Sequence, residues 1–362
     1  MHARQLRPVI NAWGTATPYG VSRSAPEVCA AVADALGRYY VMAELQQACA
    51  QRLVAWSGAP AACVTHCTAS AITLAAAACM AGSEAARIAQ LPDVADLPHR
   101  VLLLQEHDVA YGQRLTQAIR LSGATPVRCE SLAALEARLD EGGVACVFAV
   151  ESHLAPGSGP ETTRALAALC RDRVPLVLDA AAQDRRVGEL VASGADLILL
   201  SAQKYLAAPT AGIVLGTPDL VASVDAQHGG IGRGMKPSKE ALAGVMAAIE
   251  VRANEDAAAR LRAEREKIGI VVAAARSWRG IEASVEADPV GNDTERVWLR
   301  VEERAAGAPA SELARRLRDG DTAVATAPHR LQHGQLGLEL SGATVDEVRV
   351  LCGEISRLLG DA

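Results

Sequence analysis

The sequence predicts an α/β fold, with a large domain built on a mostly parallel β-sheet and a smaller α/β domain after it. Short apolar segments alternate with helical patterns through the middle of the chain. These segments do not alternate apolar and polar residues, as strands do when one face of their sheet is exposed to solvent. Helices are therefore expected to cover both faces of the sheet. A length of 362 residues also fits a large and a small domain better than one core.

The large domain is expected to hold several strands whose ends carry polar residues. The expected strands are residues 101–105, 144–150, 176–179, 197–200 and 213–215. Residues 115–121 and 162–170 have helical patterns, and Ser122-Gly123 ends the first. Sheets of this kind bind ligands beyond the carboxyl ends of their strands. The polar residues to examine there are 106–108, 151–153, 179 and 201–204.

The last third of the chain predicts a linking helix and a second α/β unit. Residues 236–265 read as one long helical stretch, broken at most once. Strand-like segments follow at 297–301 and 335–340, with helices over 311–317 and 344–359 that Ser311 and Thr344 are expected to cap. The expected boundaries are an N-terminal segment 1–45, a large domain 46–235, a linking helix 236–265 and a small C-terminal domain 266–362.

Composition argues against several classes of protein. A net charge of −6, a pI near 5.8 and the lack of a basic run disfavour nucleic acid as the main partner. No apolar stretch resembles a signal peptide, and the alanine-rich segment 69–81 reads as a buried helix rather than a membrane span. The nine cysteines show no paired CxxC spacing, which favours reduced thiols and a cytoplasmic protein.

A metal site is not expected. Cys63, His66 and Cys67 lie close together in the sequence, but no second pair of ligands accompanies them.

Lys204 is the first candidate for chemistry. It follows an apolar strand, and small residues follow it: Ala207, Ala208, Pro209, Ala211 and Gly212. A lysine at a strand end is most often a solvated terminus, but these residues leave room for a ligand beside the backbone.

Four further groups complete a plausible set. Asp179 ends the strand at 176–179, where an aspartate is otherwise often a helix cap. Thr68 and Ser70 begin the alanine-rich helix, where hydroxyls and main-chain N–H groups suit a phosphate, although an ordinary cap is the bland alternative. His107 follows the strand at 101–105 and could stack on a ring or be an ordinary loop residue. Ser201 and Gln203 could add donors.

Together these residues suit pyridoxal 5′-phosphate (PLP). That cofactor needs a lysine for its Schiff base, a carboxylate beside its pyridine nitrogen, donors for its phosphate and a flat group on its ring. The residues occur in a plausible order for each role.

The order of motifs resembles the fold-type I PLP-dependent enzymes, specifically the selenocysteine synthase-like group. That group includes L-seryl-tRNA selenium transferases and D-glucosaminate-6-phosphate ammonia-lyase-like proteins. The resemblance covers residues 9–250 and rests on VINAWGTATPYG, THCTASAITLAAAACMAG, EHDVAYGQ, LVLDAAAQ, SAQKYLAAPTAGIVLG and GIGRGMKPSKEA. It implies a homodimer or larger homo-oligomer, with segment 1–45 contributing to the active site and dimer and 46–235 binding PLP.

The resemblance also assigns roles. It implies Lys204 and Asp179 as catalytic residues and a cofactor site of Thr68, Ala69, Ser70, His107, Asp179, Ser201, Gln203 and Lys204. Arg23, Arg233 and Lys236 fall where the group carries basic residues facing substrate. The chain departs from the group at His66-Cys67-Thr68, where relatives tend to have Gly and Ala, so the pocket is expected to be narrower.

The expected reaction is lysis of a small anionic amino acid or amino sugar acid by Cα deprotonation and elimination. Racemisation, aldol cleavage or transamination of a small amino acid remains the alternative, because each starts from the same carbanion. Selenium or sulfur transfer to seryl-tRNA is disfavoured by the acidic chain and by the early start of the first motif, at residue 9. A non-enzymatic binding protein is disfavoured by the presence of both Lys204 and Asp179.

Overall fold

The computed structural model describes residues 6–155 and 157–360, and the chain divides into two compact units. The large unit comprises residues 24–254. The small unit is formed by the chain up to Arg23 together with the chain from Glu255 onward.

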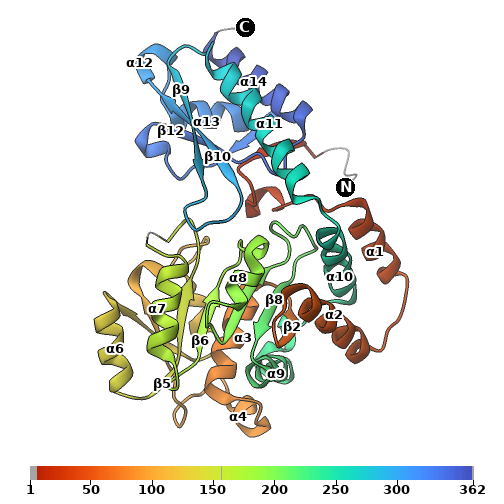
Figure 1. The fold of residues 1–362 in the computed structure, drawn as a ribbon, viewed down its shortest axis with the longest axis vertical. Helices are drawn as coiled ribbons and strands as arrows, with labels where there is room; N and C mark the ends of the chain where they lie inside the picture. Colours follow the sequence, from red (N-terminus) through yellow and green to blue (C-terminus); the bar gives the residue numbers. More distant parts are fainter. Residues whose placement is uncertain (1–5, 156, 361–362) are drawn as a thin grey trace. The chain divides into compact units, whose positions relative to one another are not determined.

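The large unit is built on a seven-stranded sheet (Figure 1). Its strands are β2 (Ala61–Thr65), β3 (Arg100–Leu104), β4 (Thr125–Cys129), β5 (Val144–Val150), β6 (Leu176–Asp179), β7 (Leu197–Ser201) and β8 (Gly212–Gly216). Their order is β2-β8-β7-β6-β5-β3-β4, and β8 runs antiparallel to both of its neighbours while the other pairs are parallel. The expected mostly parallel α/β sheet is confirmed.

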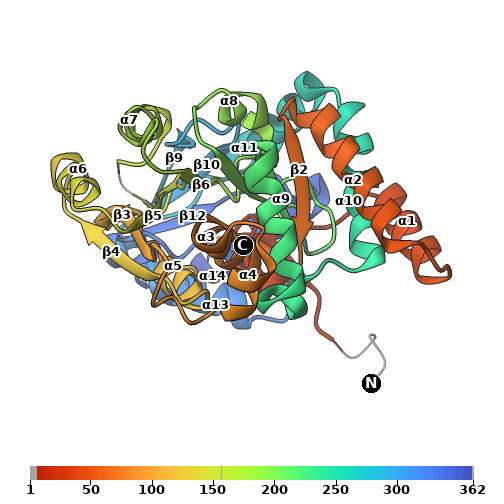
Figure 2. The ribbon, with the colours of Figure 1, turned by 90° about the horizontal axis from the view of Figure 1, so that it is seen from below.

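Helices cover both faces of this sheet, which explains why its strands are apolar throughout (Figure 2). Helices α2 (Met42–Ser57), α6 (Leu132–Asp140), α7 (Pro160–Cys170), α8 (Val187–Val191) and α10 (Lys239–Ala253) contribute to one core. Helices α3 (Thr68–Ala81), α4 (Ala85–Gln90), α5 (Leu115–Arg120) and α9 (Pro218–Ala226) contribute to the other. Helix α1 (Pro26–Leu36) packs on α10. The alanine-rich α3 is buried almost all round, as the sequence predicts.

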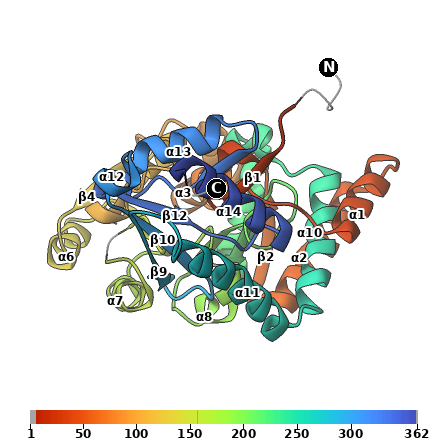
Figure 3. The same ribbon diagram turned by 90° about the horizontal axis from the view of Figure 1, so that it is seen from above.

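The small unit joins the two ends of the described chain through strand pairing. Strand β1 (Val9–Ala12) pairs in parallel with β11 (Ala323–Thr326). Strands β9 (Ile281–Ala287), β10 (Glu295–Val301) and β12 (Gln335–Leu338) form an antiparallel sheet in the order β12-β10-β9. Helices α11 (Ala257–Ala275), α13 (Ala310–Asp319) and α14 (Val345–Leu359) share one core with these strands, and the short α12 (Glu303–Ala306) follows β10 (Figure 3).

Two details of the last third differ from expectation. The helical stretch runs from Lys239 to Ala275 in place of 236–265, and the single break that the sequence allows falls at Asn254 to Asp256, between α10 and α11, with Asp256 capping α11. Ser311 does not cap α13, because the helix already starts at Ala310 after the extended Pro309. Thr344 does cap α14, in a capping box with Glu347.

No helix in the described part of the chain is long and apolar enough to cross a membrane.

Candidate active site

The candidate site lies at the edge of the large sheet formed by the carboxyl ends of its parallel strands. The strand register there places residues that are distant in the sequence side by side. Strands β2, β6 and β7 end at this edge and β8 begins there. Gly212, the first residue of β8, is paired with Thr65 on one side and with Ser201 on the other. Asp179 at the end of β6 is paired with Leu199 of β7. The topology of the sheet therefore places the polar residues at these strand ends near one another, as the sequence predicts.

Asp179 is a buried carboxylate. The residue is 1% exposed, and its Oδ1 accepts a hydrogen bond of 3.2 Å from the main-chain N–H of Ala181. Burial raises the pKa of Asp179 from 3.8 to about 6, and the Lys204 charge and the Ala181 hydrogen bond oppose that rise. A cation or a protonated ring nitrogen placed beside this carboxylate would stabilise its charged form.

Lys204 lies in a tight turn after β7. Its N–H donates to Ser201 O at 3.2 Å, and its own carbonyl accepts from Ala207 N at 3.0 Å. Ala207 has a φ of +54°, a left-handed conformation that a residue with a side chain rarely adopts. Burial lowers the pKa of Lys204, while the charges of Asp179 and Asp184 raise it. A neutral amine is therefore easier to reach here than on a solvated lysine.

The start of α3, from Cys67 to Ser70, carries polar side chains and lies beside β7, the strand that precedes Lys204; we call it the α3 cup. Cys67 is the N-cap, and its Sγ accepts from Ser70 N at 3.4 Å. Thr68 Oγ1 donates to Leu200 O at 3.3 Å, which ties the helix start to β7. A Cβ added to Gly212 would lie 2.4 Å from Thr65 Oγ1 and 2.5 Å from Cys67 O. Only glycine therefore lets β8 approach this cup.

His107 and Tyr111 lie beyond β3. His107 is 1% exposed, and its Nδ1 lies 3.4 Å from the donating N–H of Val150. Burial lowers the pKa of His107 to about 4, which keeps its imidazole neutral. Tyr111 was not singled out from the sequence, yet its ring centroid lies 5.5 Å from Lys204 Nζ. Loss of solvent around the phenol and the Asp179 charge raise the pKa of Tyr111.

The remaining cofactor candidates flank Lys204. Ser201 is buried at the end of β7, and its N–H donates to Ala181 O at 3.0 Å. Gln203 Oε1 accepts a hydrogen bond of 2.7 Å from Thr210 Oγ1. Ala69 lies in the first turn of α3, between Thr68 and Ser70.

The three expected substrate cations lie in different units. Arg23 belongs to the small unit, where it donates to both carboxylate oxygens of Glu347 and to Gly342 O. Arg233 and Lys236 are exposed on the large unit. Their loop is joined to the α3 cup, because His66 N donates to Met235 O at 2.7 Å.

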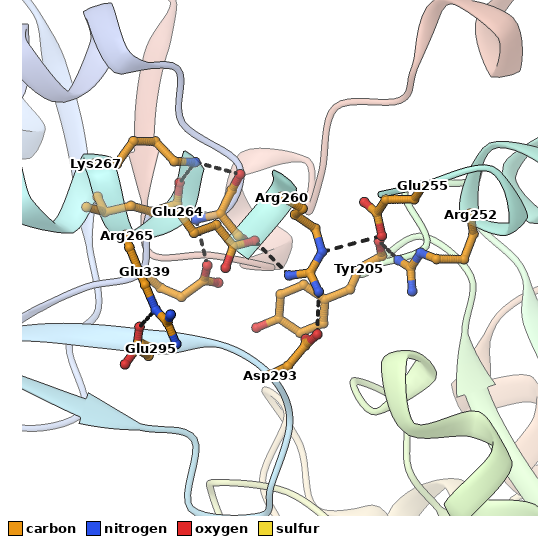
Figure 4. Close-up of polar contacts among 12 residues, drawn as sticks. Tyr205, Arg252, Glu255, Arg260, Glu264, Arg265, Lys267, Asp293, Glu295 and Glu339 are labelled. Atoms are coloured by element: carbon orange, nitrogen blue, oxygen red, sulfur yellow. Dashed lines mark hydrogen bonds and ion pairs between the residues drawn. The ribbon is translucent and has the colours of Figure 1, made fainter. Parts of the chain in front are cut away.

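A set of buried ion pairs surrounds the same edge and was missed from the sequence. Arg186 Nη1 lies 3.1 Å from Glu151 Oε2, and Thr163 Oγ1 donates to the other oxygen of Glu151. Arg252 Nη1 lies 3.0 Å from Asp184 Oδ2. Arg252 also donates to the main-chain carbonyl of Tyr205, the residue after Lys204 (Figure 4). The run DRR after LVLDAAAQ was the available signal.

The residues present fit PLP. The donor set offers an amine with a lowered pKa, a buried carboxylate, hydroxyls at a helix start with a glycine-dependent cup, and aromatic rings near the lysine. In the described ranges no group of three or more His, Cys, Asp or Glu side chains gathers as a metal site would require. Fold and site thus define the class of fold-type I PLP-dependent enzymes.

Comparison with known proteins narrows this class. The chain is 31% identical to D-glucosaminate-6-phosphate ammonia lyase of Salmonella typhimurium, over 98% of this chain and 96% of that protein. It is 30% identical to 5′-C-glycyluridine monooxygenase-decarboxylase of a Streptomyces species, over 98% and 90% of the two chains. No family model matches.

Solved structures agree. The structure of D-glucosaminate-6-phosphate ammonia-lyase superposes with a TM-score of 0.86 at 30% identity, covering 99% of this chain and 97% of that one. Serine palmitoyltransferase of Sphingomonas wittichii, at 16% identity and a TM-score of 0.63 over 98% and 88% of the two chains, shares the fold. The chain belongs to the family of D-glucosaminate-6-phosphate ammonia lyase.

Proposed function

We propose that the protein is a PLP-dependent lyase that acts on a small anionic amino acid or amino sugar acid by Cα deprotonation and elimination. The observation that carries the proposal is the convergence of Lys204 and Asp179 at one sheet edge. It occurs in a chain similar over 98% of its length to D-glucosaminate-6-phosphate ammonia lyase.

The residues that would hold PLP are Lys204, Asp179, Ser201, Gln203 and the start of α3 at Thr68, Ala69 and Ser70, with His107 or Tyr111 at the ring. When bound, PLP supplies an electron sink for the charge that develops at the substrate Cα. Asp179 contributes a fixed negative charge that favours protonation of a facing nitrogen.

Besides holding PLP, Lys204 would act as the base that accepts the Cα proton. Burial lowers its pKa, so its Nζ can carry a lone pair and accept the Cα proton. Arg233 and Lys236, on the loop joined to His66, would hold the substrate carboxylate by charge-assisted hydrogen bonds. Arg23 would act the same way only if its pair with Glu347 opened.

The net reaction balances without an oxidant. A 2-amino-3-hydroxy acid loses its Cα proton and its β-hydroxyl as water. Water then replaces the nitrogen, which leaves a 2-keto acid and ammonium.

The test is to supply the PLP-loaded protein with D-glucosaminate 6-phosphate and with panels of D- and L-amino acids. We expect equal amounts of ammonium and keto acid from an anionic β-hydroxy substrate. Racemisation, aldehyde release or amino transfer without ammonium would contradict the proposed elimination.

One second candidate has an observation in its favour. The similarity to 5′-C-glycyluridine monooxygenase-decarboxylase is nearly as high as that to the lyase. Consumption of O2 with release of CO2 in the same assays would favour that chemistry.

The assembly and location are proposed with it. We infer a homodimer or larger homo-oligomer, for which an exposed apolar segment between α1 and α2 gives support. A cytoplasmic location is supported by the cysteines, which are all free in the structure.

A further inference from the structure

Three consecutive charged residues, Asp184–Arg186, form a short helical turn that follows β6 in the sequence, and we call them the charged turn. Each of the three contacts a different part of the large unit. The first lies against Arg252 of α10, the second lies over the ring of Tyr205 after β7, and the third pairs with Glu151 after β5. The proposed mechanism uses none of these contacts.

Arg252 joins the charged turn to the segment that carries Lys204. Its Nη1 lies 3.0 Å from Asp184 Oδ2, and its Nη2 donates to the main-chain carbonyl of Tyr205 at 2.5 Å (Figure 4). The Asp184 side chain is 1% exposed and that of Arg252 is 15% exposed, so the bridge is largely shielded from water. A planar guanidinium serves two acceptors in a fixed geometry. The bridge therefore fixes the Tyr205 carbonyl relative to Asp184.

Tyr205 is held from a second side by the charged turn. Arg185 Cζ lies 4.8 Å from the centroid of the Tyr205 ring, within the range of a cation–π contact. Tyr205 directly follows Lys204, and the left-handed Ala207 is two residues further on. A left-handed residue that carries a side chain persists only where its surroundings hold it. The charged turn and Arg252 thus hold the segment that presents Lys204.

Asp184 also acts on Lys204 through its charge. The charges of Asp179 and Asp184 both raise the pKa of Lys204, against the burial that lowers it. The ring of Tyr111 also faces Lys204 Nζ, but loss of solvent raises the pKa of this phenol, which keeps it neutral near pH 7. Lys204 therefore lies between two carboxylates, which come from the end of β6 and from the charged turn.

The partners of Asp184 favour its charged form. Burial raises the pKa of Asp184, whereas the guanidinium groups of Arg252 and Arg185 lower it. A carboxyl group buried without such partners would be driven toward its neutral form. Arg252 therefore has two effects, because it holds the turn after Lys204 and helps Asp184 to keep a negative charge.

We propose that Asp184 and Arg252 are positioning residues for Lys204, in which Arg252 fixes the turn that carries the lysine and Asp184 supplies a second negative charge facing it. The inference rests on the proposed function and deepens it, since it names the groups that set the position and charge of the residue that holds PLP. Both act through Lys204, as supporting groups do around a precisely placed functional side chain.

The first measurement is the pH midpoint at which the visible absorbance of the PLP-loaded protein changes, which reports protonation of the Lys204 nitrogen. Asp184→Asn keeps the shape of the side chain and an oxygen that can accept from Arg252, but it removes the charge. We expect the midpoint to fall by about one pH unit, because a negative charge that favours the protonated nitrogen is lost.

Glu151→Gln is the matched control for the lost charge. Glu151 is 2% exposed and forms the other buried ion pair of the charged turn, with Arg186. This variant should leave the midpoint unchanged. Equal falls in Asp184→Asn and Glu151→Gln would show that the loss of any buried carboxylate has this effect, and would overturn the role of Asp184.

The second measurement is the rate of PLP release from Arg252→Lys, which keeps the positive charge but loses the planar fork. We expect release to be about 10-fold faster, because a lysine cannot hold Asp184 and the Tyr205 carbonyl together. Arg100→Lys is the matched control. Arg100 also bridges a carboxylate, that of Glu141, and a main-chain carbonyl, but at the start of β3. Arg252→Lys tests the bridge even if Asp184→Asn does not fold.

The outcomes separate this inference from the proposed function. An unchanged midpoint in Asp184→Asn, or release of PLP from Arg252→Lys at the rate of Arg100→Lys, overturns the positioning roles. A wild-type protein that does not bind PLP contradicts the proposed function instead, and trace acetylation of Lys204 across pH then measures the same midpoint in the cofactor-free chain. A lowered midpoint without ammonium release from any substrate supports the positioning role of Asp184 and contradicts the lyase.

Discussion

Lys204 and Asp179 carry opposite charges in a buried setting that disfavours the charged form of both. Burial lowers the pKa of Lys204 and raises that of Asp179, while each charge moves the pKa of the other back toward its ordinary value. Such opposed shifts are frequent at catalytic sites, although structural ion pairs also produce them.

The first prediction concerns the lysine that carries the cofactor. Borohydride reduction of the PLP-loaded protein, followed by peptide mapping, should place the pyridoxyl group on Lys204, because this amine has a lowered pKa. Lys204→Ala should abolish turnover. Lys239, which donates to main-chain carbonyls of Leu36 and Arg38, is a matched control. Label on Lys239 or any lysine other than Lys204 would overturn the assignment.

The second prediction concerns Asp179 and pH. Its folded pKa of about 6 lies above the ordinary 3.8, so the folded protein holds this proton more tightly than the unfolded chain. Its contribution to stability is therefore complete below about pH 4 and is lost as the pH rises through 6. Asp179→Asn should stabilise the cofactor-free protein at pH 7.5, by at most about 3 kcal/mol, and much less at pH 4.5.

Urea unfolding of the cofactor-free wild type and variant at the two pH values measures this difference. The same variant in the PLP-loaded enzyme should lose activity by at least about 100-fold, the scale of a missing electrostatic partner. An identical stability difference at pH 4.5 and 7.5 would show that the carboxyl does not titrate as described.

Residues at strand ends were predictable from the sequence because strand ends of a parallel sheet share an edge. Lys204 and Asp179 were singled out in this way, and Thr68 was singled out at the start of a helix. Tyr111 and Arg252 were not, because Tyr111 reaches the site from a loop and Arg252 from a distant helix, and no periodic pattern encodes such contacts. Arg23 was singled out from the sequence as a substrate cation, but in the structure it pairs with Glu347. Such a pair between residues far apart in the sequence leaves no local pattern by which it could be predicted.

At the scale of elements, two of the strands that the sequence did not predict were hidden for identifiable physical reasons. Strand β4 contains Pro126 and lies at the sheet edge, where a proline is tolerated but weakens the pattern. Strand β9 is half exposed and rich in charge, so it lacks the apolar run of the buried strands. Strand β5 is buried at all of its positions, and its expected bounds of 144–150 are confirmed.

The third prediction concerns how β8 meets β2 and α3. In Gly212→Ala the new Cβ would clash with Thr65 Oγ1 and Cys67 O, so β8 or the start of α3 must move. We expect a loss of about 1–3 kcal/mol in stability and at least about 10-fold weaker binding of PLP.

Gly188→Ala is the matched control, since no atom lies within 4 Å of a Cβ at that helical position. It should be neutral or slightly stabilising. Fluorescence titration with PLP and urea midpoints measure both variants. Wild-type PLP affinity in Gly212→Ala would mean that the α3 cup does not hold the cofactor.

At the scale of the whole molecule, the large unit displays one cluster of apolar side chains that its own core does not use. The segment between α1 and α2 carries Leu36, Tyr39, Tyr40, Val41 and Met42, each between 37% and 102% exposed. Lys239 Nζ donates to the carbonyls of Leu36 and Arg38, which ties this segment to the start of α10. An exposed apolar cluster of this kind is typical of an interaction surface.

The last prediction is that this segment lies in the homodimer interface. Tyr39→Ser with Val41→Ser should raise the dissociation constant of the dimer by at least about 100-fold, because two large side chains lose their buried apolar area. Leu121→Ser is the matched control, since Leu121 is 62% exposed elsewhere on the same unit and should leave assembly unchanged. Sedimentation of the PLP-loaded proteins over a range of concentrations measures the constant. Dissociation of both variants alike, or of neither, would place the interface on another surface, and a monomeric wild type would contradict the homodimer itself.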